Sequence, residues 1–495
     1  MQDAHDLGLV LKSKVPLLVL ETYDEPRAID LLIKVSRQHN DPLFQWTATE
    51  GLRRVGIGLQ LESEQEHVEP EAVLSYIKSH GKPGIYVLCD FHHWLGDEHP
   101  KNIRLLKDTA LRHHQGSITV VLLSHRLRLP PELSRLSARF ETTLPDEDHI
   151  RGVVRAEAQR WARDNQNQRV KTDQDTLQKL VSNLRGLTHG EVTRLARGVI
   201  VDDGAINESD LPEINRAKFE LMDMDGVLSY EYRTEHFANV GGMTHLKAWL
   251  ETRRKVFLGE VDAGADTPKG ILLLGIQGSG KSLAAKAVAG MWGVPLLRLD
   301  VGALYNKFYG ETERNLREAL KLADAMSPCV LWLDEIEKGL SGDSNDSGVS
   351  QRVLATLLTW MSERKTQVFL VATSNDISKL PPELVRKGRF DELFFVDLPD
   401  AEAREIIFSI HLSNRGMSTD RFNLAELAAA SEGFSGAEIE QAVVSAYYTA
   451  LAREVDVENR SLLEEIYQAN PLSVVMAGRI QELRDWAKSH QVSLA

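Results

Sequence analysis

The sequence predicts an α/β fold made of two similar modules in tandem, of which the first is degenerate. Three observations predict it. Short apolar segments alternate with amphipathic helical stretches through most of the 495 residues, which is typical of parallel sheets covered by helices. Several phrases of the N-terminal half recur, in the same order, in the C-terminal half. A glycine-rich segment with a lysine lies between a strand and a helix in the second half and has no counterpart in the first.

The expected strands are short apolar segments, and helical stretches with a longer period follow them. From about residue 401 the strands stop and helices take over. A last helix around Ile480, Leu483 and Trp486 is expected to pack on its neighbours. We expect strands at residues 15–20, 85–89, 118–123, 271–274, 330–333 and 368–372, and helices at residues 283–290, 424–430 and 437–451.

The repeat consists of pairs of phrases that lie 244 to 254 residues apart. A single match would carry little weight, but several in one order indicate two copies of one module. The strand that ends at Asp90 corresponds to the strand that ends at Asp334. The other pairs are Leu129-Pro-Pro-Glu-Leu133 with Leu380-Pro-Pro-Glu-Leu384, Arg139-Phe140 with Arg389-Phe390, Leu144-Pro-Asp with Leu398-Pro-Asp, and Gly186-Leu-Thr-His-Gly-Glu-Val192 with Gly433-Phe-Ser-Gly-Ala-Glu-Ile439.

The composition, 42% hydrophobic and 26% charged, is that of an ordinary globular protein. A net charge of −14 argues against a protein that coats nucleic acid or an anionic membrane. No apolar run is long enough to span a bilayer, and the acidic N-terminal segment does not resemble a signal peptide. Cys89 and Cys329 lie in apolar runs and are interpreted as buried core residues. We therefore expect a cytoplasmic protein and neither nucleic acid nor a membrane as a partner.

The segment from Gly275 to Ser282 has the pattern of a phosphate-binding loop. It follows an apolar strand and opens a helix, which a merely structural glycine turn would not require. Its glycines allow backbone N–H groups to close around a phosphate, and the helix N-terminus adds a partial positive charge. Lys281 would reach the β- and γ-phosphates, and the hydroxyl of Ser282 would ligate Mg²⁺.

Two further strands end in polar residues that suit hydrolysis. Asp334 can hold Mg²⁺ through water, and Glu335 can polarise the attacking water as general base. Asn375 follows the next strand and can orient that water, unless it merely starts a turn. Each pattern is weak alone, but beyond a phosphate-binding loop they predict an ATPase.

From Phe237 to about Tyr448 the chain resembles the AAA family of ATPases. Asp334-Glu335 is similar to its Walker B end and Asn375 to its sensor one. The segment from Glu383 to Asp391 resembles the second region of homology, which implies that Arg386 and Arg389 act on the ATP of a neighbouring subunit. The resemblance implies nucleotide contacts at Val240, Gly241, Gly275, Ile276, Gln277, Gly278, Ser279, Gly280, Lys281, Ser282, Leu283, the lid histidine His411, and Gly436 and Ala437 of sensor two.

Within the family, the chain most resembles the uncharacterised ycf group of cyanobacteria, plastids and other bacteria. The resemblance lies in the phrases Asp334-Glu-Ile-Glu-Lys338 and Leu384-Val-Arg-Lys-Gly-Arg-Phe-Asp-Glu392 and in a first module of similar length. The resemblance implies a parallel P-loop sheet with helices on both faces and a helical lid. It also implies a homo-oligomeric ring, expected to be a hexamer. The expected domains are a degenerate AAA-like module at 1–205, a linker with some helix at 206–235, the AAA α/β domain at 236–400, and the lid with C-terminal helices at 401–495.

Lys307, Phe308 and Tyr309 match the pore loop, in which an aromatic side chain grips a threaded polypeptide. The alternative is an aromatic pair that packs in the core. Residues 339–350 form an acidic, flexible segment in the position of a second pore loop.

The first module lacks the phosphate-binding residues. Its first strand leads into Glu21, Asp24 and Glu25, whose carboxylates would repel phosphate, and no glycine or lysine is present there. Phe91, rather than a glutamate, follows Asp90. We therefore expect this module neither to bind nor to hydrolyse ATP.

Two features of the first module are open to interpretation. Arg135 and Arg139 stand in the arginine positions and are either remnants of the fold or contacts to a neighbour. The pairs His92-His93 and His113-His114 are interpreted as solvated loop histidines, because no acidic or cysteine partner has ligand spacing.

Three functions fit these observations. The favoured one is a motor that remodels or unfolds a protein client, which the sequence does not name, through the aromatic pore loop. The alternative is a nucleotide-switched scaffold that binds partners through its inert first module. Nucleic-acid remodelling is disfavoured by the acidic composition and by Ala437 where other branches carry arginine.

Overall fold

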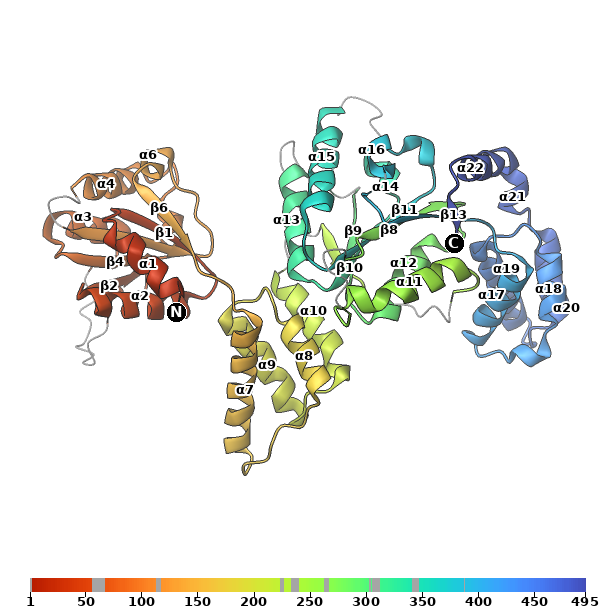
Figure 1. Cartoon of the computed structure of the whole chain (residues 1–495), viewed down its shortest axis with the longest axis horizontal. Coiled ribbons are helices and arrows are strands. Elements are labelled where there is room, and N and C mark those ends of the chain that lie inside the picture. The colour runs from red at the N-terminus through yellow and green to blue at the C-terminus, as the bar shows by residue number, and fades with distance from the viewer. Residues whose placement is uncertain are drawn as a thin grey trace. The chain divides into compact units, whose positions relative to one another are not determined.

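The computed structural model describes residues 2–55, 67–112, 117–222, 227–232, 240–261, 267–301, 304, 312–340, 347–386 and 388–495. The chain forms two compact units. The first comprises residues 1–171 and 185–205, and the second comprises residues 172–184 and 206–495. Figure 1 shows the whole chain, with the sheet of the first unit in red to orange and that of the second in green to teal.

The first unit contains a six-stranded sheet in the order β3-β2-β4-β5-β1-β6. All neighbouring strands are parallel except β2 and β3. Successive residues of β1 point to opposite faces, so Leu18 and Leu20 pack with α1 and α2, and Leu17 and Val19 pack with α3 and α4. The strands are β1 (Leu17–Glu21), β2 (Leu43–Thr47), β3 (Gly51–Val55), β4 (Gly84–Cys89), β5 (Ile118–Ser124) and β6 (Ser137–Glu141).

The helices of the first unit cover both faces of this sheet and add a helical pair, α7 and α9, that packs together. The helices are α1 (Gln2–Lys12), α2 (Glu25–His39), α3 (Pro70–His80), η1 (Phe91–Trp94), α4 (Pro100–Leu111), α6 (Pro131–Ser134), α7 (Glu147–Asp164) and α9 (His189–Asp203). The unit therefore has the three-layer arrangement expected of parallel α/β folds.

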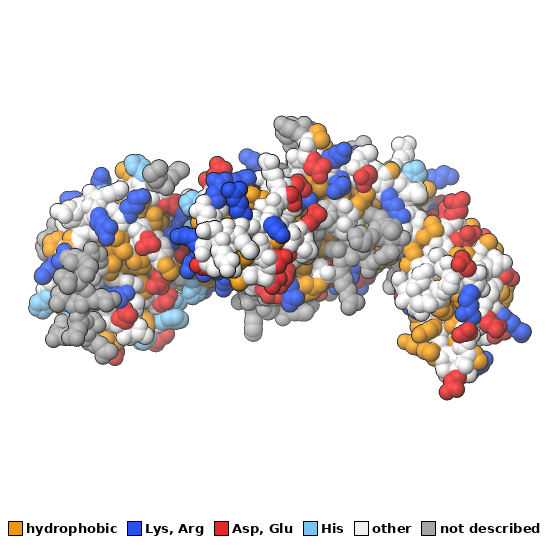
Figure 2. Space-filling model, turned by 90° about the horizontal axis from the view of Figure 1, so that it is seen from below, with side chains coloured by type: hydrophobic (Ala, Val, Ile, Leu, Met, Phe, Trp, Pro, Cys, Tyr) orange, Lys and Arg blue, Asp and Glu red, His pale blue; other side chains and the backbone are white. Residues whose placement is uncertain are grey.

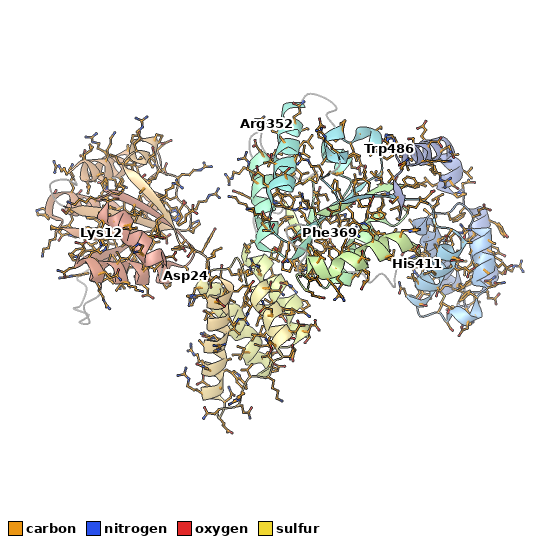
Figure 3. The ribbon with its side chains drawn as sticks, in the orientation of Figure 1. Lys12, Asp24, Arg352, Phe369, His411 and Trp486 are labelled. Carbon is orange, nitrogen blue, oxygen red and sulfur yellow. The ribbon has the colours of Figure 1, made fainter. Side chains whose placement is uncertain are left out.

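The second unit contains a seven-stranded sheet in the order β13-β12-β8-β11-β10-β9-β7. Its strands are parallel except for the pair β7 and β9. Phe369 of β11, labelled in Figure 3, packs in the core with α11 and α12. The strands are β7 (Leu228–Tyr230), β8 (Gly270–Gly275), β9 (Leu296–Leu299), β10 (Cys329–Leu333), β11 (Val368–Ser374), β12 (Glu392–Val396) and β13 (Ser493–Leu494).

Two sets of helices cover the second sheet. The helices α11 (Thr244–Phe257) and α12 (Lys281–Trp292) pack on one face. The helices α10, α13, α15 and α22 pack on the other face, where α22 contributes Leu483, Trp486 and Ala487, as expected for the last helix. The bounds are α8 (Gln174–Asn183), α10 (Leu211–Met222), α13 (Thr312–Ala325), α14 (Ile336–Leu340), α15 (Ser347–Glu363), α16 (Pro382–Val385), α21 (Leu472–Val475) and α22 (Ala477–Ser489).

A helical lid follows the second sheet and has a hydrophobic core of its own. Phe408, Leu427, Val443 and Leu462, one from each of its four helices, are all buried in that core. The lid helices are α17 (Ala401–Ser413), α18 (Leu424–Ala430), α19 (Gly436–Ala452) and α20 (Asn459–Gln468).

The two sheets share one strand order, which confirms the predicted repeat. β2-β4-β5-β1-β6 of the first unit corresponds to β9-β10-β11-β8-β12 of the second. The six predicted strands are present within two residues of their expected bounds, and Cys89 and Cys329 are buried and free, as predicted. The expectation that strands stop at residue 401 was wrong at one place, because β13 pairs with β12.

Residues 206–235, expected to form a linker with some helix, contain α10 and β7. Both elements pack on the second unit: β7 pairs with β9, and Lys218 of α10 donates from Nζ to the carbonyl of Ala325 at 2.6 Å. The domain bounds expected from the sequence, 1–205, 206–235, 236–400 and 401–495, remain predictions. No helix among the described residues is long and apolar enough to cross a membrane.

Candidate nucleotide-binding site

The glycine-rich loop of the second unit joins the buried strand β8 to α12. Gly275 has φ +149°, and a Cβ atom there would lie 2.1 Å from the carbonyl oxygen of Val396. Gly278 and Gly280 also have positive φ, at +77° and +94°. A side chain is therefore excluded by contact at Gly275 and disfavoured by backbone conformation at all three positions.

Lys281, the first residue of α12, is buried beneath this loop. Its Nζ donates to the carbonyls of Gly275 at 3.0 Å and Ile276 at 2.6 Å. Burial lowers the pKa of Lys281 to about 8, although the nearby carboxylates of Glu337, Asp334 and Glu335 act in the opposite direction. The ammonium group is therefore held at the loop, close to three negative charges.

Ser282 and Asp334 present oxygen atoms side by side at the mouth of the loop. The hydroxyl of Ser282 donates to Oδ1 of Asp334 at 3.3 Å. Asp334 also accepts from the hydroxyl of Thr373 at 2.7 Å and pairs with Arg298 at 3.3 Å. A hydroxyl and a carboxylate suit Mg²⁺, which prefers oxygen ligands and keeps several waters, so these residues fit that ion.

Glu335 is fixed by residues of the neighbouring strand. It has a left-handed backbone, with φ 48°, and its N–H donates to the hydroxyl of Thr373 at 3.0 Å. Nδ2 of Asn375 donates to Oε1 of Glu335 at 3.0 Å. The backbone N–H of Asn375 in turn donates to the buried Glu337, also at 3.0 Å. The structure therefore joins the two predicted polar strand ends through direct hydrogen bonds.

A cavity of about 870 Å³ brings these residues together with the lid. The backbone N–H of Ala437, at the start of α19, donates to the carbonyl of Gly278 at 3.2 Å and ties the lid to the loop. His411 lies on α17 of the lid (Figure 3). The predicted residues that line the cavity are Val240, Gly241, Gln277, Gly278, Ser279, Gly280, Lys281, Ser282, Leu283, Asp334, Glu335, Asn375, His411, Gly436 and Ala437.

His411 faces a charged pair across the lid. Its Nδ1 lies 3.7 Å from Oε1 of Glu440, which also pairs with Arg415 at 3.4 Å. The pKa of His411 is lowered overall, because burial has the largest effect and Arg415 acts in the same direction, whereas Glu440 alone raises it. The imidazole is therefore neutral at pH 7 and can donate or accept at the cavity wall.

Several lining residues were not predicted from the sequence. Thr373 holds both Asp334 and Glu335, and its only sequence signal is a hydroxyl at the end of an otherwise apolar strand. Glu337 does not line the cavity but accepts from the backbone N–H of Asn375, and no sequence signal predicted this contact because it depends on how two strand ends meet. The other unpredicted lining residues are Met243, Ile407, Ile410, Asn414, Arg415 and Glu440.

The remaining predicted residues do not line the cavity. Gly275 and Ile276 instead supply carbonyls to Lys281. Arg386 is exposed, and Arg389 donates from Nη1 to the carbonyl of Leu358 at 2.6 Å. The predicted pore-loop residues Lys307, Phe308 and Tyr309 lie outside the described residues, as does much of the segment at 339–350.

The corresponding loop of the first unit is closed by charged side chains. Glu21, at the end of β1, pairs with Nη1 of Arg139 at 3.1 Å and accepts from the backbone N–H of Leu127 at 2.7 Å. Arg139 lies within β6, opposite Val19, whereas Arg389 precedes β12. The expectation that Arg139 occupies the position of Arg389 was therefore wrong, because the segment before β6 is shorter than the segment before β12.

A second correction concerns Asp90. β5 and β11 each have seven residues and end at Ser124 and Ser374, so Leu123 corresponds to Thr373. β4 pairs Cys89 with Leu123, whereas β10 pairs Leu333 with Ala372, one residue before Thr373. This register places Cys89 at the position of Asp334 and Asp90 at the position of Glu335. Asp90 and Glu335 also share the left-handed backbone, with φ 52° and 48°. The first unit therefore has Cys89 where the second has Asp334, the candidate Mg²⁺ ligand, and a shorter acid where the second has Glu335.

Whole-chain comparison with known proteins agrees with this arrangement. The chain is 34% identical to "Uncharacterized AAA domain-containing protein ycf46" of Guillardia theta, over 100% of this chain and 97% of that protein. It is 32% identical to the protein of the same name from Trieres chinensis, over 99% and 97%. The chain belongs to the AAA ATPase family, in the group of the ycf46 proteins.

Matches to individual families divide this AAA protein into four segments. Residues 271–398 match the ATPase family associated with various cellular activities (AAA), and residues 421–465 match the AAA+ lid domain. Residues 3–142 and 148–225 match the N-terminal and second domains of SpoVK-like AAA ATPases. The chain is also 38% identical to the proteasome-activating nucleotidase of Aeropyrum pernix, over 39% of this chain and 48% of that protein.

Proposed function

We propose that this AAA protein hydrolyses ATP to ADP and phosphate, with Mg²⁺, at the cavity of its second unit. One observation carries the proposal: Lys281, Ser282, Asp334, Glu335 and Asn375 line a single cavity. Each offers the group that phosphoryl transfer to water requires: a cation, oxygen ligands, a base and a residue that positions the base. Membership of the AAA family supports the same reaction.

The proposed roles follow from these positions. The backbone N–H groups of residues 277–281 and the ammonium of Lys281 bind the phosphates. Ser282 and Asp334 hold Mg²⁺, which when bound neutralises charge on the phosphate oxygens. Glu335 takes a proton from the attacking water, and Asn375 fixes its carboxylate from one side. Val240, Gly241, His411, Gly436 and Ala437 bind the base and ribose.

Replacing Glu335 with Gln tests the hydrolytic role. Since the amide cannot accept the proton, phosphate release should fall by about 10² to 10⁴-fold while binding of a fluorescent ATP analogue is retained. The matched variant Lys281→Ala should lose binding as well. Phosphate release by Glu335→Gln at the wild-type rate would refute the assignment of the base.

We also propose that the site is completed by a neighbouring subunit in a homo-oligomeric ring, with a hexamer as the expected form. The exposure of Arg386 in the single chain supports an action in trans, which in related enzymes contributes about 10³ to 10⁵ in rate. Lys281→Ala subunits supply Arg386, and Arg386→Ala subunits supply an intact site. Mixing the two inactive variants should therefore restore part of the ATPase activity. If mixed subunits co-assemble and stay inactive, the arginine acts elsewhere.

The favoured use of this activity is remodelling of a protein client through Phe308. The relative named proteasome-activating nucleotidase supports this class of function. The alternative is a nucleotide-switched scaffold. The first unit supports it, because that unit retains a packed fold although it lacks the phosphate-binding residues and has the Glu21–Arg139 ion pair at the corresponding loop.

One capture experiment separates the two functions. Glu335→Gln, which should bind ATP without hydrolysing it, retains bound clients in an extract, and Lys281→Ala serves as the control without nucleotide. Adding Phe308→Ala should release the clients if they are threaded. Deleting residues 1–200 should release them if the first unit is the scaffold. If clients are still captured after the deletion but are lost with Phe308→Ala, the scaffold function is excluded.

A further inference from the structure

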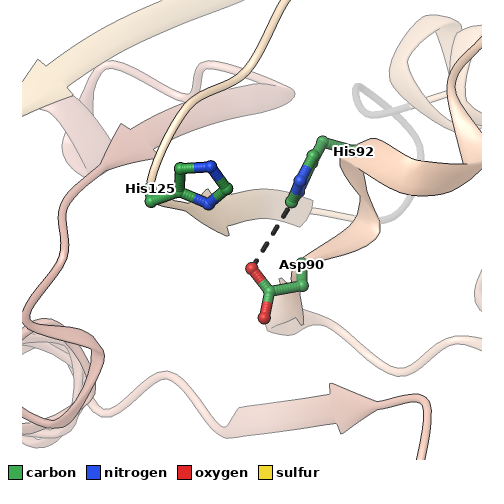
Figure 4. A group of neighbouring side chains, drawn as sticks. All are labelled: Asp90, His92 and His125. Atoms are coloured by element: carbon green, nitrogen blue, oxygen red, sulfur yellow. Dashed lines mark ion pairs between the residues drawn. The ribbon is translucent and has the colours of Figure 1, made fainter. Parts of the chain in front are cut away.

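Three ligand-type side chains of the first unit meet at one edge of its sheet. Asp90 follows β4, His92 lies in η1, and His125 follows β5. One ligand atom from each residue lies within 4.8 Å of the others. Figure 4 shows the ring of His92 facing the carboxylate of Asp90, with His125 beside them on the neighbouring strand end. The sequence expectation of solvated loop histidines was wrong for His92, which is only 18% exposed in its side chain.

His92 lacks the partner that a buried ring nitrogen normally has. Its Nδ1 is buried and has no hydrogen-bond partner among the described residues, and the nearest carboxylate oxygen, Oδ1 of Asp90, is 3.9 Å away. This buried, unpartnered nitrogen is therefore available to a ligand such as a metal ion, which binds neutral imidazole.

We propose that Asp90, His92 and His125 bind a divalent transition-metal ion, of which Zn²⁺ fits best. Two imidazoles and one carboxylate are a common ligand set for first-row metals, and Zn²⁺ takes three such ligands with water at the fourth position. Mg²⁺ is disfavoured because it prefers oxygen ligands. Ligand atoms around a tetrahedral zinc ion lie about 3.4 Å apart, so the group must contract slightly. Exposed Asp90 and His125 can rotate to do so.

The position of the group within the fold supports the proposal independently. Asp90 stands where the second unit has Glu335, and His125, directly after Ser124, stands where it has Asn375 directly after Ser374. In the second unit these two residues hydrogen-bond at 3.0 Å. The same pair of strand ends therefore brings side chains together in both units, and in the first unit the side chains are metal ligands.

A small cavity lies beside the proposed ion. His125 lines this cavity of about 220 Å³, together with Glu21, Tyr23, Asp24 and Arg27. Asp90 is 59% exposed, so an ion has access from solvent. A bound ion would keep at least one position for water or for an incoming donor group, as zinc sites with three protein ligands do.

Zinc binding to the full-length protein, stripped of metal with a chelator, tests the proposal. The Asp334→Asn background removes the carboxylate of the nucleotide site, so that a second metal does not interfere. Titration calorimetry with zinc chloride should give one equivalent per chain. His125→Asn, which installs the residue of the second unit, should weaken binding on the order of a hundredfold, the upper end of what losing even an outer-shell partner costs.

A matched control separates the ligands from their surroundings. The ring of His93 contacts that of His92 in a tilted arrangement, with centroids 4.0 Å apart, but His93 is not part of the ligand group. His93→Gln should therefore bind zinc as the parent does. Cobalt(II) provides a second readout: its visible absorption bands should appear with the parent and with His93→Gln and vanish with His125→Asn. Thermal unfolding by circular dichroism verifies that each variant is folded. No zinc binding by the parent, or equal binding by folded His125→Asn, overturns the proposal.

Discussion

The two units differ in the segment that follows β1 in the first sheet and its counterpart β8 in the second. In the second unit, β8 ends at Gly275 and α12 begins at Lys281. In the first unit, β1 ends at Glu21 and α2 begins at Glu25, so the connecting segment is shorter and carries carboxylates. The strand order around both segments is the same. The proposed phosphate site therefore depends on a few residues of one loop, whereas the fold depends on the buried strands.

The contact between this loop and the following helices has survived in both units. Thr188 and Ser435 each cap a helix in a capping box, with Glu191 and Glu438 respectively. The backbone N–H groups two residues after each cap donate to the loop, from Gly190 to Oδ2 of Asp24 at 3.0 Å and from Ala437 to the carbonyl of Gly278 at 3.2 Å. The cap is thus a structural feature of the module, and only in the second unit does it face a phosphate-binding loop.

The loops also differ in how their charges are balanced. In the second unit, the ammonium of Lys281 lies on backbone carbonyls, from which a phosphate can attract it. In the first unit, Glu21 forms an ion pair with Arg139 of the same unit. A phosphate at the first loop would have to break that ion pair and approach Asp24 as well.

The largest expected effect is on nucleotide stoichiometry. The wild-type chain should bind one nucleotide, and Lys281→Ala should bind none, because the first unit offers no second site. Glu21→Ala, at the end of the corresponding strand, should leave one equivalent bound. Equilibrium dialysis with labelled ADP measures all three proteins. Two equivalents in the wild type, or one in Lys281→Ala, would mean that the first unit binds nucleotide.

The second effect concerns the residues that follow β11 and β5. Asn375→Ala removes the hydrogen bond to Glu335 and should lower the ATPase kcat by about 10²-fold, the scale seen when one preorganised polar group is lost. His125→Ala, at the corresponding place in the first unit, should leave kcat unchanged. A phosphate-release assay compares them. An equal loss in both variants would show that the first unit takes part in hydrolysis.

How much of this comparison could be predicted depends on whether the information is local. The phosphate loop was predictable because its glycines, its lysine and its flanking strand are contiguous. The two hydrogen bonds of Thr373, one accepted from Glu335 and one donated to Asp334, were not predictable, because they depend on how the ends of β10 and β11 meet. The place of Arg139 depends on a shortened segment before β6, and the meeting of His92 with His125 depends on the register of β4 and β5. None of these contacts could be predicted from the sequence, because each joins residues that only the strand register brings together.

The third effect is the pH dependence of nucleotide binding. Lys281 has a pKa of about 8 in the free protein, lowered from 10.5 by burial, and bound phosphates should raise it. ATP affinity should therefore be constant below about pH 8 and fall as the pH rises above it, by up to about tenfold per unit. Lys281→Arg, which keeps its charge, should show a flat profile. Fluorescent-nucleotide titrations from pH 6 to 9.5 compare the wild type with Lys281→Arg. If ATP affinity falls with pH equally in both proteins, a group other than Lys281 loses the proton.

The smallest effect is on stability, and it compares the two capping boxes. Thr188→Ala and Ser435→Ala each remove a side-chain cap and should lower the free energy of unfolding by about 1 kcal/mol. Only Ser435→Ala should also weaken ATP binding, because its helix begins at Gly436 and Ala437 in the cavity wall. Urea denaturation and nucleotide titration of the same samples separate the two effects. If both variants weakened ATP binding equally, the lid contact would act through general stability. A loss confined to Ser435→Ala would assign the nucleotide contact to the lid of the second unit.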